Sequence, residues 1–218
     1  HDDLSWHPYG RDVSSDSQLM LHASTATIYQ IFGMGSNLYD FTVMFPVVIS
    51  SLTVVIIFAL VRTIGGTTAG LFAALFFAVS PIIIMRGTLG WFKSEPLGLF
   101  YGLLAIYLVI SAIKLDKGKV SVAKIVGAGI LLALGLDSWG GVQFFVLPIG
   151  LFFLALPFLR KDSKFIIEIS VIFTFVLLLA TVGLDMLKAI SHPVSLGIVF
   201  ISGTSGVFLI GCTAFLVV

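Results

Sequence analysis

The chain has 218 residues, of which 58% are hydrophobic and only 11% are charged, and its mean hydropathy is +1.13. Soluble domains carry about a quarter charged residues, so this composition excludes a soluble globular class and indicates a lipid environment. The net charge of +1 gives no basic field of the kind that binds nucleic acid, so we expect membrane lipid and no nucleic acid among the partners.

The two ends of the sequence suggest that it belongs to a longer protein. The first residue is not Met, no signal-peptide pattern follows it, and Val218 lies inside an apolar run. We therefore expect further functional residues outside this chain.

Residues 1–40 are predicted to form a loop outside the membrane that contains one helix. Residues 1–17 are polar and rich in turn formers, whereas residues 18–34 are moderately apolar. Four apolar residues of the second stretch are spaced to share one side of a helix: Leu19, Ala23, Ala26 and Phe32. This spacing indicates a helix lying at the membrane interface, with a membrane-spanning helix as the alternative.

Residues 41–218 are predicted to form a transmembrane helical domain. Crossing a bilayer takes about 20 apolar residues, and seven stretches approach or reach that length. They lie near 41–61, 68–85, 96–113, 121–136, 142–159, 165–184 and 196–218. The sequence therefore predicts an all-α integral membrane protein, a multi-spanning helical bundle with about seven transmembrane helices.

Alternate loops divide the charged residues between two sides of the membrane. One side carries eight of the twelve basic residues with three acidic ones, and the other carries four basic and eight acidic residues. Lys and Arg favour the cytoplasmic side, so the basic loops KLDKGK and RKDSK are predicted to lie inside. The acidic outer side carries Trp6, Trp91 and Trp139, and such a face suits a divalent cation, a sugar or a peptide.

The outer loop MRGTLGWFKSEPL, residues 85–97, brings Arg86, Lys93 and Glu95 close together in the sequence. One interpretation is a site for an anionic head group, with Glu95 available to a hard cation such as Mg²⁺ or Mn²⁺. The alternative is an ordinary connecting loop whose charged side chains reach water at the interface.

The next outer turn reads DSWGG and lies between two short spans. Two glycines after Trp139 indicate a sharp turn, since glycine permits positive φ. Either Trp139 stacks on a substrate, or it belongs to the belt of aromatic residues at the membrane interface.

Three motifs occur in order on the predicted outer side: WHPYGRD, MRGTLGWFKSEPLG and SWGG. Together they resemble the catalytic subunit of oligosaccharyltransferase, in particular the archaeal single-subunit enzymes, over residues 1 to about 185. The family motifs are W-x-P-x-G-R, R-x3-G-[YF]-x-D-x-[DEH] and A-W-G-G. The matching residues here are Trp6, Pro8, Gly10 and Arg11, then Arg86, Gly90, Trp91 and Glu95, then Trp139, Gly140 and Gly141.

The resemblance implies a GT-C membrane glycosyltransferase that moves an oligosaccharide from a lipid-linked phosphate or pyrophosphate to the Asn of Asn-x-Ser/Thr in an acceptor polypeptide. It implies Mn²⁺ or Mg²⁺ as cofactor and an active face outside the cytoplasm, in a multi-pass protein of the cell membrane. Glu95 is then a catalytic and metal-binding residue, and Arg86 supports the donor or the loop. Lys93, Arg86, Trp91 and Trp139 are the candidate contacts to the substrate and lipid phosphate.

One position departs from the family pattern, because Lys93 stands where the family has its metal-binding Asp. An ammonium group cannot ligate a cation and repels one nearby. We favour metal binding through Glu95 and residues outside this chain, with Lys93 on the donor phosphate. A weakened or different activity is the alternative.

Other function classes remain open at this stage. One is another GT-C transferase, acting on a lipid or on a different protein acceptor; by resemblance, the SWGG turn and the WHPYGRD loop favour the asparagine-linked enzyme over it. A secondary transporter is expected to have ionisable groups near the middle of the membrane, whereas the ionisable residues here lie almost entirely in predicted loops. A non-catalytic membrane scaffold is expected to tolerate changes in the loop from Arg86 to Glu95.

Overall fold

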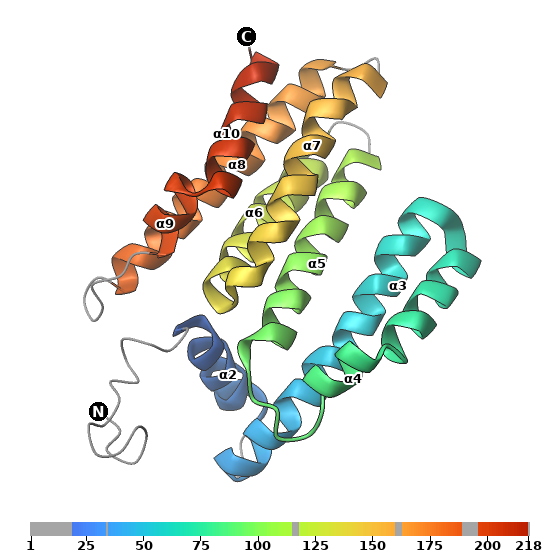
Figure 1. Ribbon diagram of the computed structural model, residues 1–218, viewed down its shortest axis with the longest axis vertical. Coiled ribbons are helices and arrows are strands. Elements are labelled where there is room, and N and C mark those ends of the chain that lie inside the picture. Colours follow the sequence, from blue (N-terminus) through green and yellow to red (C-terminus); the bar gives the residue numbers. More distant parts are fainter. Residues whose placement is uncertain (1–18, 34, 115–117, 160–162, 189–195, 218) are drawn as a thin grey trace.

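The structure, a computed structural model, describes residues 19–33, 35–114, 118–159, 163–188 and 196–217, and every regular element in these ranges is a helix. Figure 1 shows long helices side by side in a bundle, with α3 and α4 along one side of it. The helices are α2 (Leu19–Phe32), α3 (Leu38–Ala78), α4 (Pro81–Arg86), α5 (Ser94–Lys114), α6 (Lys119–Ser138), the 3₁₀ helix η1 (Gly140–Val142), α7 (Gln143–Leu159), α8 (Ser163–Lys188), α9 (Leu196–Ser202) and α10 (Thr204–Val217).

The all-α membrane class is confirmed, and the chain is a multi-pass membrane protein. Within the described ranges, five helical segments are long and apolar enough to cross a bilayer. They are Leu38–Ala78, Ser94–Lys114, Lys119–Ser138, Gly140–Phe158 and Lys164–Leu187. The expected spans near 41–61 and 68–85 are joined in α3 and α4, and the span near 196–218 is divided into α9 and α10.

The joined spans form a helical hairpin. Gly66 interrupts α3 with φ 84° and ψ 177°, and the chain reverses direction there (Figure 1). A Cβ atom at Gly70 would lie 2.9 Å from the carbonyl oxygen of Phe58, so only glycine lets the second arm pack this closely on the first. The returning arm ends before Pro81, which stands at the start of α4 and cannot continue the preceding helix.

The break near the chain end lies at Gly203, between α9 and α10. Its amide donates to the carbonyl oxygen of Val199 at 2.9 Å, so the last turn of α9 is closed there. A Cβ at the neighbouring Gly206 would lie 2.2 Å from the carbonyl oxygen of Phe200, so α10 begins pressed against the end of α9. The apolar stretch is therefore a bent pair of short helices.

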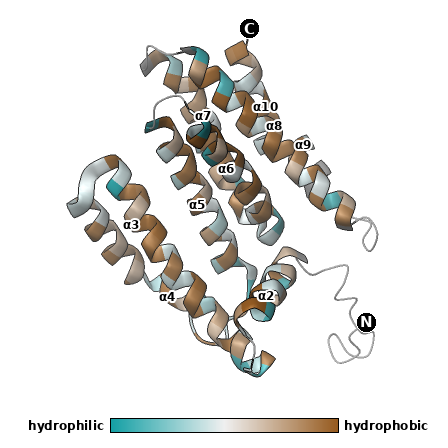
Figure 2. Ribbon diagram, turned by 180° about the vertical axis from the view of Figure 1, so that it is seen from behind, coloured by the Kyte–Doolittle hydropathy of each residue, from teal (hydrophilic) through white to brown (hydrophobic). Residues whose placement is uncertain are grey.

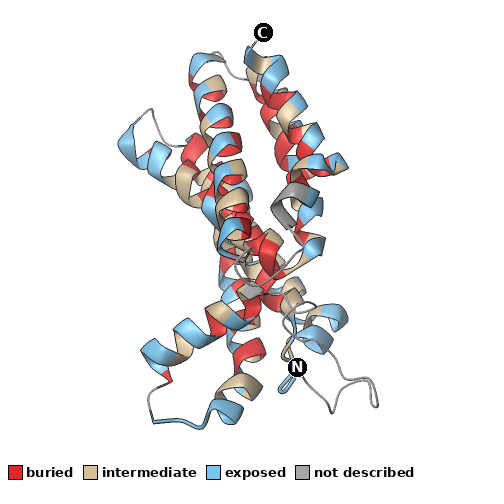
Figure 3. Cartoon of the chain, turned by 90° about the vertical axis from the view of Figure 1, so that its left-hand side faces the viewer, coloured by how far each residue is buried: buried red, intermediate tan, exposed pale blue. Residues whose placement is uncertain are grey.

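The core lies between α5, α6, α7, α8 and α10. Ala105, Leu132 and Phe153 are fully buried in it, and the rings of Phe153 and Phe173 meet edge to face at 5.4 Å. Figure 3 shows the buried residues on the inward sides of the bundle helices and exposed residues on their outward sides. Many outward residues are large and apolar, such as Phe175 and Phe215, and Figure 2 shows hydrophobic colouring along most of the bundle. This surface is matched to lipid.

The described parts of the predicted outer and inner loops lie at opposite ends of the bundle. The connection from α4 to α5, the turn from α6 to α7 and helix α2 lie at one end in Figure 1. The C-terminal end of α5 and the N-terminal end of α6, which carry Lys114 and Lys119, lie at the other. We call these the acidic end and the basic end; which of them faces the cytoplasm stays a prediction.

Helix α2 corresponds to the helix that the sequence predicts at residues 18–34. Leu21 is buried against Phe45 of α3 and Leu97 of α5, and the hydroxyls of Ser24 and Tyr101 are 3.0 Å apart. On the predicted apolar side, Phe32 is 79% exposed. The helix is thus attached to the bundle by one side, and its opposite side is left open.

Candidate functional site

The loop between α4 and α5 is attached to α3 through Gly90. This residue has φ 77°, which favours glycine, and its amide donates to the carbonyl oxygen of Val43 at 3.0 Å. The amide of Trp91 donates to the carbonyl oxygen of Thr88 at 3.1 Å and closes a turn just before it. The glycine of the second motif therefore shapes the loop and fixes it to the bundle.

An ion pair joins the two ends of this loop. Nη1 of Arg86, the last residue of α4, lies 2.9 Å from Oε1 of Glu95 in the first turn of α5. An acidic residue in the first turn of a helix is favoured by the positive N-terminal end of the helix dipole, and Glu95 stands at such a position. The side chains are 44% and 20% exposed, so the pair sits at the surface with the carboxylate on the more buried side.

Trp91 lies under two cations. The guanidinium carbon of Arg86 is 5.2 Å from its ring centroid, and Nζ of Lys93 is 4.6 Å away. A cation over an indole face is attracted by the ring quadrupole. The structure thus brings together the four residues that the sequence singled out in this loop, and the aromatic ring is the shared contact of both cations.

The fit of a divalent cation can be judged at Glu95. Its Oε1 is engaged by Arg86, whereas Oε2 is buried and has no hydrogen-bond partner within the described part of the chain. A buried unpaired carboxylate oxygen is costly, and a cation would satisfy it. No group of three or more His, Cys, Asp or Glu side chains suited to a metal occurs among the described residues. Glu95 therefore fits as one ligand.

The sequence led us to expect that the two glycines after Trp139 are needed for positive φ, and this expectation is wrong. Gly140 and Gly141 do not have positive φ, and Gly140 begins the short helix η1. A Cβ at Gly141 would lie 2.4 Å from Cζ2 of the Trp139 ring, whereas a Cβ at Gly140 would meet nothing within 4 Å. The second glycine is thus required by the close approach of the indole, and the first is not.

Trp139 also connects this turn to the start of α5. A Cβ at Gly98 would lie 2.6 Å from the Cβ of Trp139, and Gly98 follows Glu95 within one helical turn. The side chain packs on the main core and remains partly exposed. The second and third motifs are therefore neighbours at the acidic end, as expected for two motifs predicted on the same side of the membrane.

The first motif cannot be placed in this arrangement. Trp6, Pro8, Gly10 and Arg11 lie outside the described residues. Helix α2 begins shortly after them, and its His22 ring lies 6.2 Å from the ring of Phe92 in the loop. Helix α2, the first described element after this motif, thus lies beside the loop that carries the second motif.

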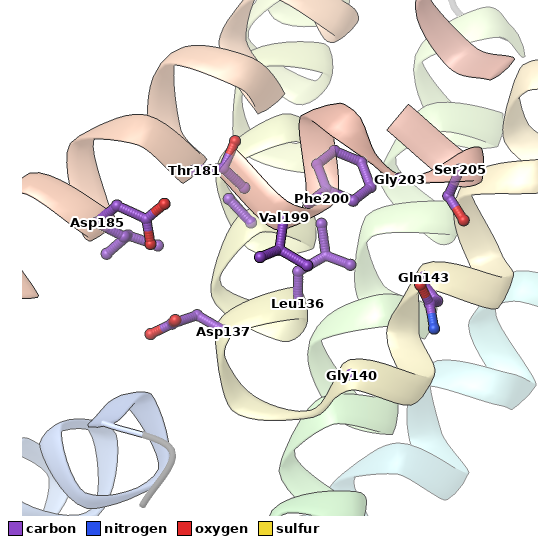
Figure 4. A pocket seen from close by; sticks show the side chains of 12 residues that line it. Leu136, Asp137, Gly140, Gln143, Thr181, Asp185, Val199, Phe200, Gly203 and Ser205 are labelled. Atoms are coloured by element: carbon purple, nitrogen blue, oxygen red, sulfur yellow. The ribbon is translucent and has the colours of Figure 1, made fainter. Parts of the chain in front are cut away.

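A cavity that sequence reasoning missed lies at the same end of the bundle. It has a volume of about 200 Å³ and lies between α6, α7, α8 and the bend from α9 to α10. Asp137 and Asp185, only 4% and 8% exposed, line it together with Gln143, Thr181 and Ser205. Figure 4 shows the two carboxylates on the same side of the cavity, from different helices.

Carboxylate, amide and hydroxyl groups facing a cavity can bind a cation or the hydroxyls of a sugar. The sequence signal was present, because ionisable residues bordering long apolar spans are costly and rarely lack a role. In the charge pattern of the sequence, Asp137 and Asp185 stand only among the eight acidic residues of the predicted outer side.

Comparison with known proteins points to one family. Residues 1–217 match the family model described as "Oligosaccharyl transferase STT3, N-terminal". A curated relative, the dolichyl-diphosphooligosaccharide–protein glycosyltransferase subunit STT3B of Oryza sativa subsp. japonica, is 24% identical over 205 residues. That match covers 90% of this chain and 28% of the relative, so the chain spans about a quarter of the relative's length.

Two solved structures from Archaeoglobus fulgidus share the fold. The oligosaccharyltransferase AglB in complex with an inhibitory peptide and a dolichol-phosphate matches with a TM-score of 0.72 and 21% identity, over 98% of this chain and 26% of that one. The oligosaccharyltransferase in complex with Zn and sulfate matches with a TM-score of 0.73 and 21% identity, over 99% of this chain and 28% of that one.

Proposed function

The chain belongs to the STT3 oligosaccharyl transferase family, and on this premise we propose that the whole protein is a membrane glycosyltransferase acting in protein N-glycosylation. It moves an oligosaccharide from a lipid-linked phosphate or pyrophosphate donor to the Asn of Asn-x-Ser/Thr in an acceptor polypeptide. The similar archaeal enzyme in complex with a peptide and a dolichol-phosphate supports these two partners. The observation that carries the proposal is the constellation of Arg86, Trp91, Lys93 and Glu95 at the end of the bundle where the family motifs meet.

In this proposal the loop binds the charged part of the donor. Lys93 and Arg86 contact the donor phosphate, and the Trp91 ring holds both cations in place. Both side chains are exposed, but Arg86 is paired with Glu95, so Lys93 is the better placed of the two for this contact. Trp139 borders the same region and contributes its partly exposed indole to the substrate.

In the proposed site Glu95 would hold a divalent cation, Mn²⁺ or Mg²⁺, with the Oε2 atom that has no hydrogen-bond partner among the described residues. When bound, the cation neutralises negative charge that develops on the leaving phosphate. Arg86 orients the Glu95 carboxylate by holding its other oxygen, and Lys93 adds positive charge next to the donor. The remaining ligands would come from outside the described residues. A similar enzyme in complex with Zn supports a divalent ion.

The proposed membrane arrangement has the acidic end outside the cytoplasm and the protein in the cell membrane. The basic loops at the other end support this orientation. The two arms of the α3 and α4 hairpin would make separate crossings, and α9 and α10 together would make the last, giving seven. Helix α2 would lie at the interface with its open side toward lipid, so that residues 1–40 form an outer loop and 41–218 the membrane domain.

The test uses the whole protein in detergent with lipid-linked glycan extract from its own source and a fluorescent Asn-x-Thr peptide. We expect Glu95→Gln to lower transfer about tenfold or more, which corresponds to losing about 1.4 kcal/mol of transition-state stabilisation. Glu168→Gln is the matched control, because Glu168 is an exposed carboxylate of α8 far from the loop. Equal rates in the Glu95 variant and the wild type would remove Glu95 from the site.

The same assay with EDTA separates the roles of metal and lysine. Transfer that EDTA abolishes supports a metal site that tolerates Lys93. If transfer continues in EDTA, the proposed reaction still holds, and Lys93 supplies part of the charge neutralisation that a metal would otherwise provide. An unmodified peptide, with a control enzyme active on the same extract, would favour a GT-C enzyme with another acceptor.

A further inference from the structure

A second polar pocket lies at the basic end, away from the motifs. It has a volume of about 360 Å³ and opens between the first arm of α3 and the C-terminal end of α5. Its lining consists of Phe58, Ala59, Arg62, Thr63, Tyr107 and Lys114. Neither the ion pair at Glu95 nor the cavity at Asp137 involves these residues.

The two cations of this pocket are held in place by the fold. Nζ of Lys114 donates to the backbone carbonyl of Thr63, which lies in the last turn of α3 before the break at Gly66. The guanidinium carbon of Arg62 lies 5.8 Å from the centroid of the Phe58 ring, one turn earlier on the same helix. Lysine has three N–H donors, so Lys114 retains two for a ligand.

The charge of the pocket is positive and uncompensated by its lining. Among the described residues that line it, none is acidic, and the side chains of Arg62 and Lys114 are both exposed. Arg binds phosphate through its planar fork and Lys binds it as a point charge. Tyr107 of α5 also lines the pocket. The lining is therefore suited to a phosphate group.

An apolar stripe on the surface of α3 leads from the pocket along the helix, away from the basic end. Leu52, Val55, Ala59 and Arg62 follow one another at three- or four-residue spacing and so share one side of the helix. Leu52 and Val55 are 45% and 60% exposed, and they lie in a segment apolar enough to cross the bilayer. A ligand with a phosphate in the pocket and a hydrocarbon chain on this stripe would match both surfaces.

We propose that this pocket binds the phosphate of an anionic phospholipid, with an acyl chain lying on the stripe from Ala59 to Leu52. Basic pockets between membrane helices recognise anionic lipid head groups in this way. The lipid would join the α3 hairpin to α5 in the leaflet at the basic end. The proposal is independent of the transfer reaction, since it uses no residue of the candidate active site.

The experiment is native mass spectrometry of the whole protein in detergent, titrated with phosphatidylglycerol or with phosphatidylcholine. We expect phosphatidylglycerol to bind more tightly, and Arg62→Gln and Lys114→Gln each to weaken its binding about fivefold, since each basic residue contributes about 1 kcal/mol to anionic lipid binding. Lys119→Gln is the matched control, because Lys119 is exposed at the same end but does not line the pocket.

Three results would overturn the proposal: equal binding of the two lipids, equal weakening in the Lys119 variant, or displacement of the lipid by inorganic phosphate alone. The last result would assign the pocket to a soluble phosphate compound. Arg62→Gln keeps the test valid if Lys114→Gln unfolds the protein, because the recorded contact of the Arg62 guanidinium is to a neighbouring ring and not to the backbone.

Discussion

The two adjacent glycines after Trp139 are expected to differ in their response to alanine: Gly141 should lose stability and Gly140 should not. A methyl group at Gly141 would lie 2.4, 2.5 and 2.6 Å from Cζ2, Cε2 and Cη2 of the Trp139 ring. A methyl group at Gly140 would meet no atom within 4 Å. Both positions have backbone angles that alanine adopts, so the contrast isolates the steric effect.

The ring has little freedom to move away from a new methyl group. On the other side of the turn, Trp139 is held by Gly98, where a Cβ would lie 2.6 Å from the Trp139 Cβ. Forcing an extra methyl into a packed site costs about 1–3 kcal/mol. We therefore expect Gly141→Ala to lower the free energy of unfolding by about that amount, and Gly140→Ala to change it by no more than about 0.5 kcal/mol.

The assay is denaturant unfolding of the whole protein in detergent micelles, with glycan transfer to the peptide measured on the same samples. Gly141→Ala should also reduce transfer, because the displaced indole borders the start of α5 near Glu95. Equal stabilities of the two variants would refute the claim that the indole occupies the space above Gly141. A larger loss in Gly140→Ala would contradict the described turn altogether.

Further predictions concern the loop and the bundle. Trp91→Phe should lower transfer about two- to fivefold in the peptide assay, because each exposed cation–π contact contributes about 0.5–1 kcal/mol and phenylalanine is the weaker partner; an unchanged rate would separate the ring from the cations. Gly90→Ala should destabilise the protein by about 1–2 kcal/mol in denaturant, since its φ is 77° and its amide bonds to Val43; wild-type stability would disprove this backbone conformation. A double-mutant cycle of Thr174→Val and Thr213→Val should give a coupling of about 0.6 kcal/mol, because their hydroxyls are 2.8 Å apart between α8 and α10, and additive losses would exclude that hydrogen bond.

The candidate site could be predicted only where its parts lie close in the sequence. Arg86, Lys93 and Glu95 belong to one loop between two apolar helices, so their nearness follows from the chain itself. The ion pair and the stacking of both cations on Trp91 depend on how that loop folds, and the structure supplied them. Asp137 and Asp185 come from different helices, and only the packing of α6 against α8 brings them to one cavity.

The sequence by itself determined the membrane class, the helical content and the separation of acidic and basic loops. These features follow from how many apolar residues a bilayer requires and from which charges flank them, and both quantities are local. Tertiary structure decided where an apolar stretch turns or bends, as at Gly66 and Gly203, and why Gly141 must be a glycine. Hydropathy records the solvent that a residue prefers, whereas turns, close approaches and shared cavities depend on atoms that distant parts of the chain bring together.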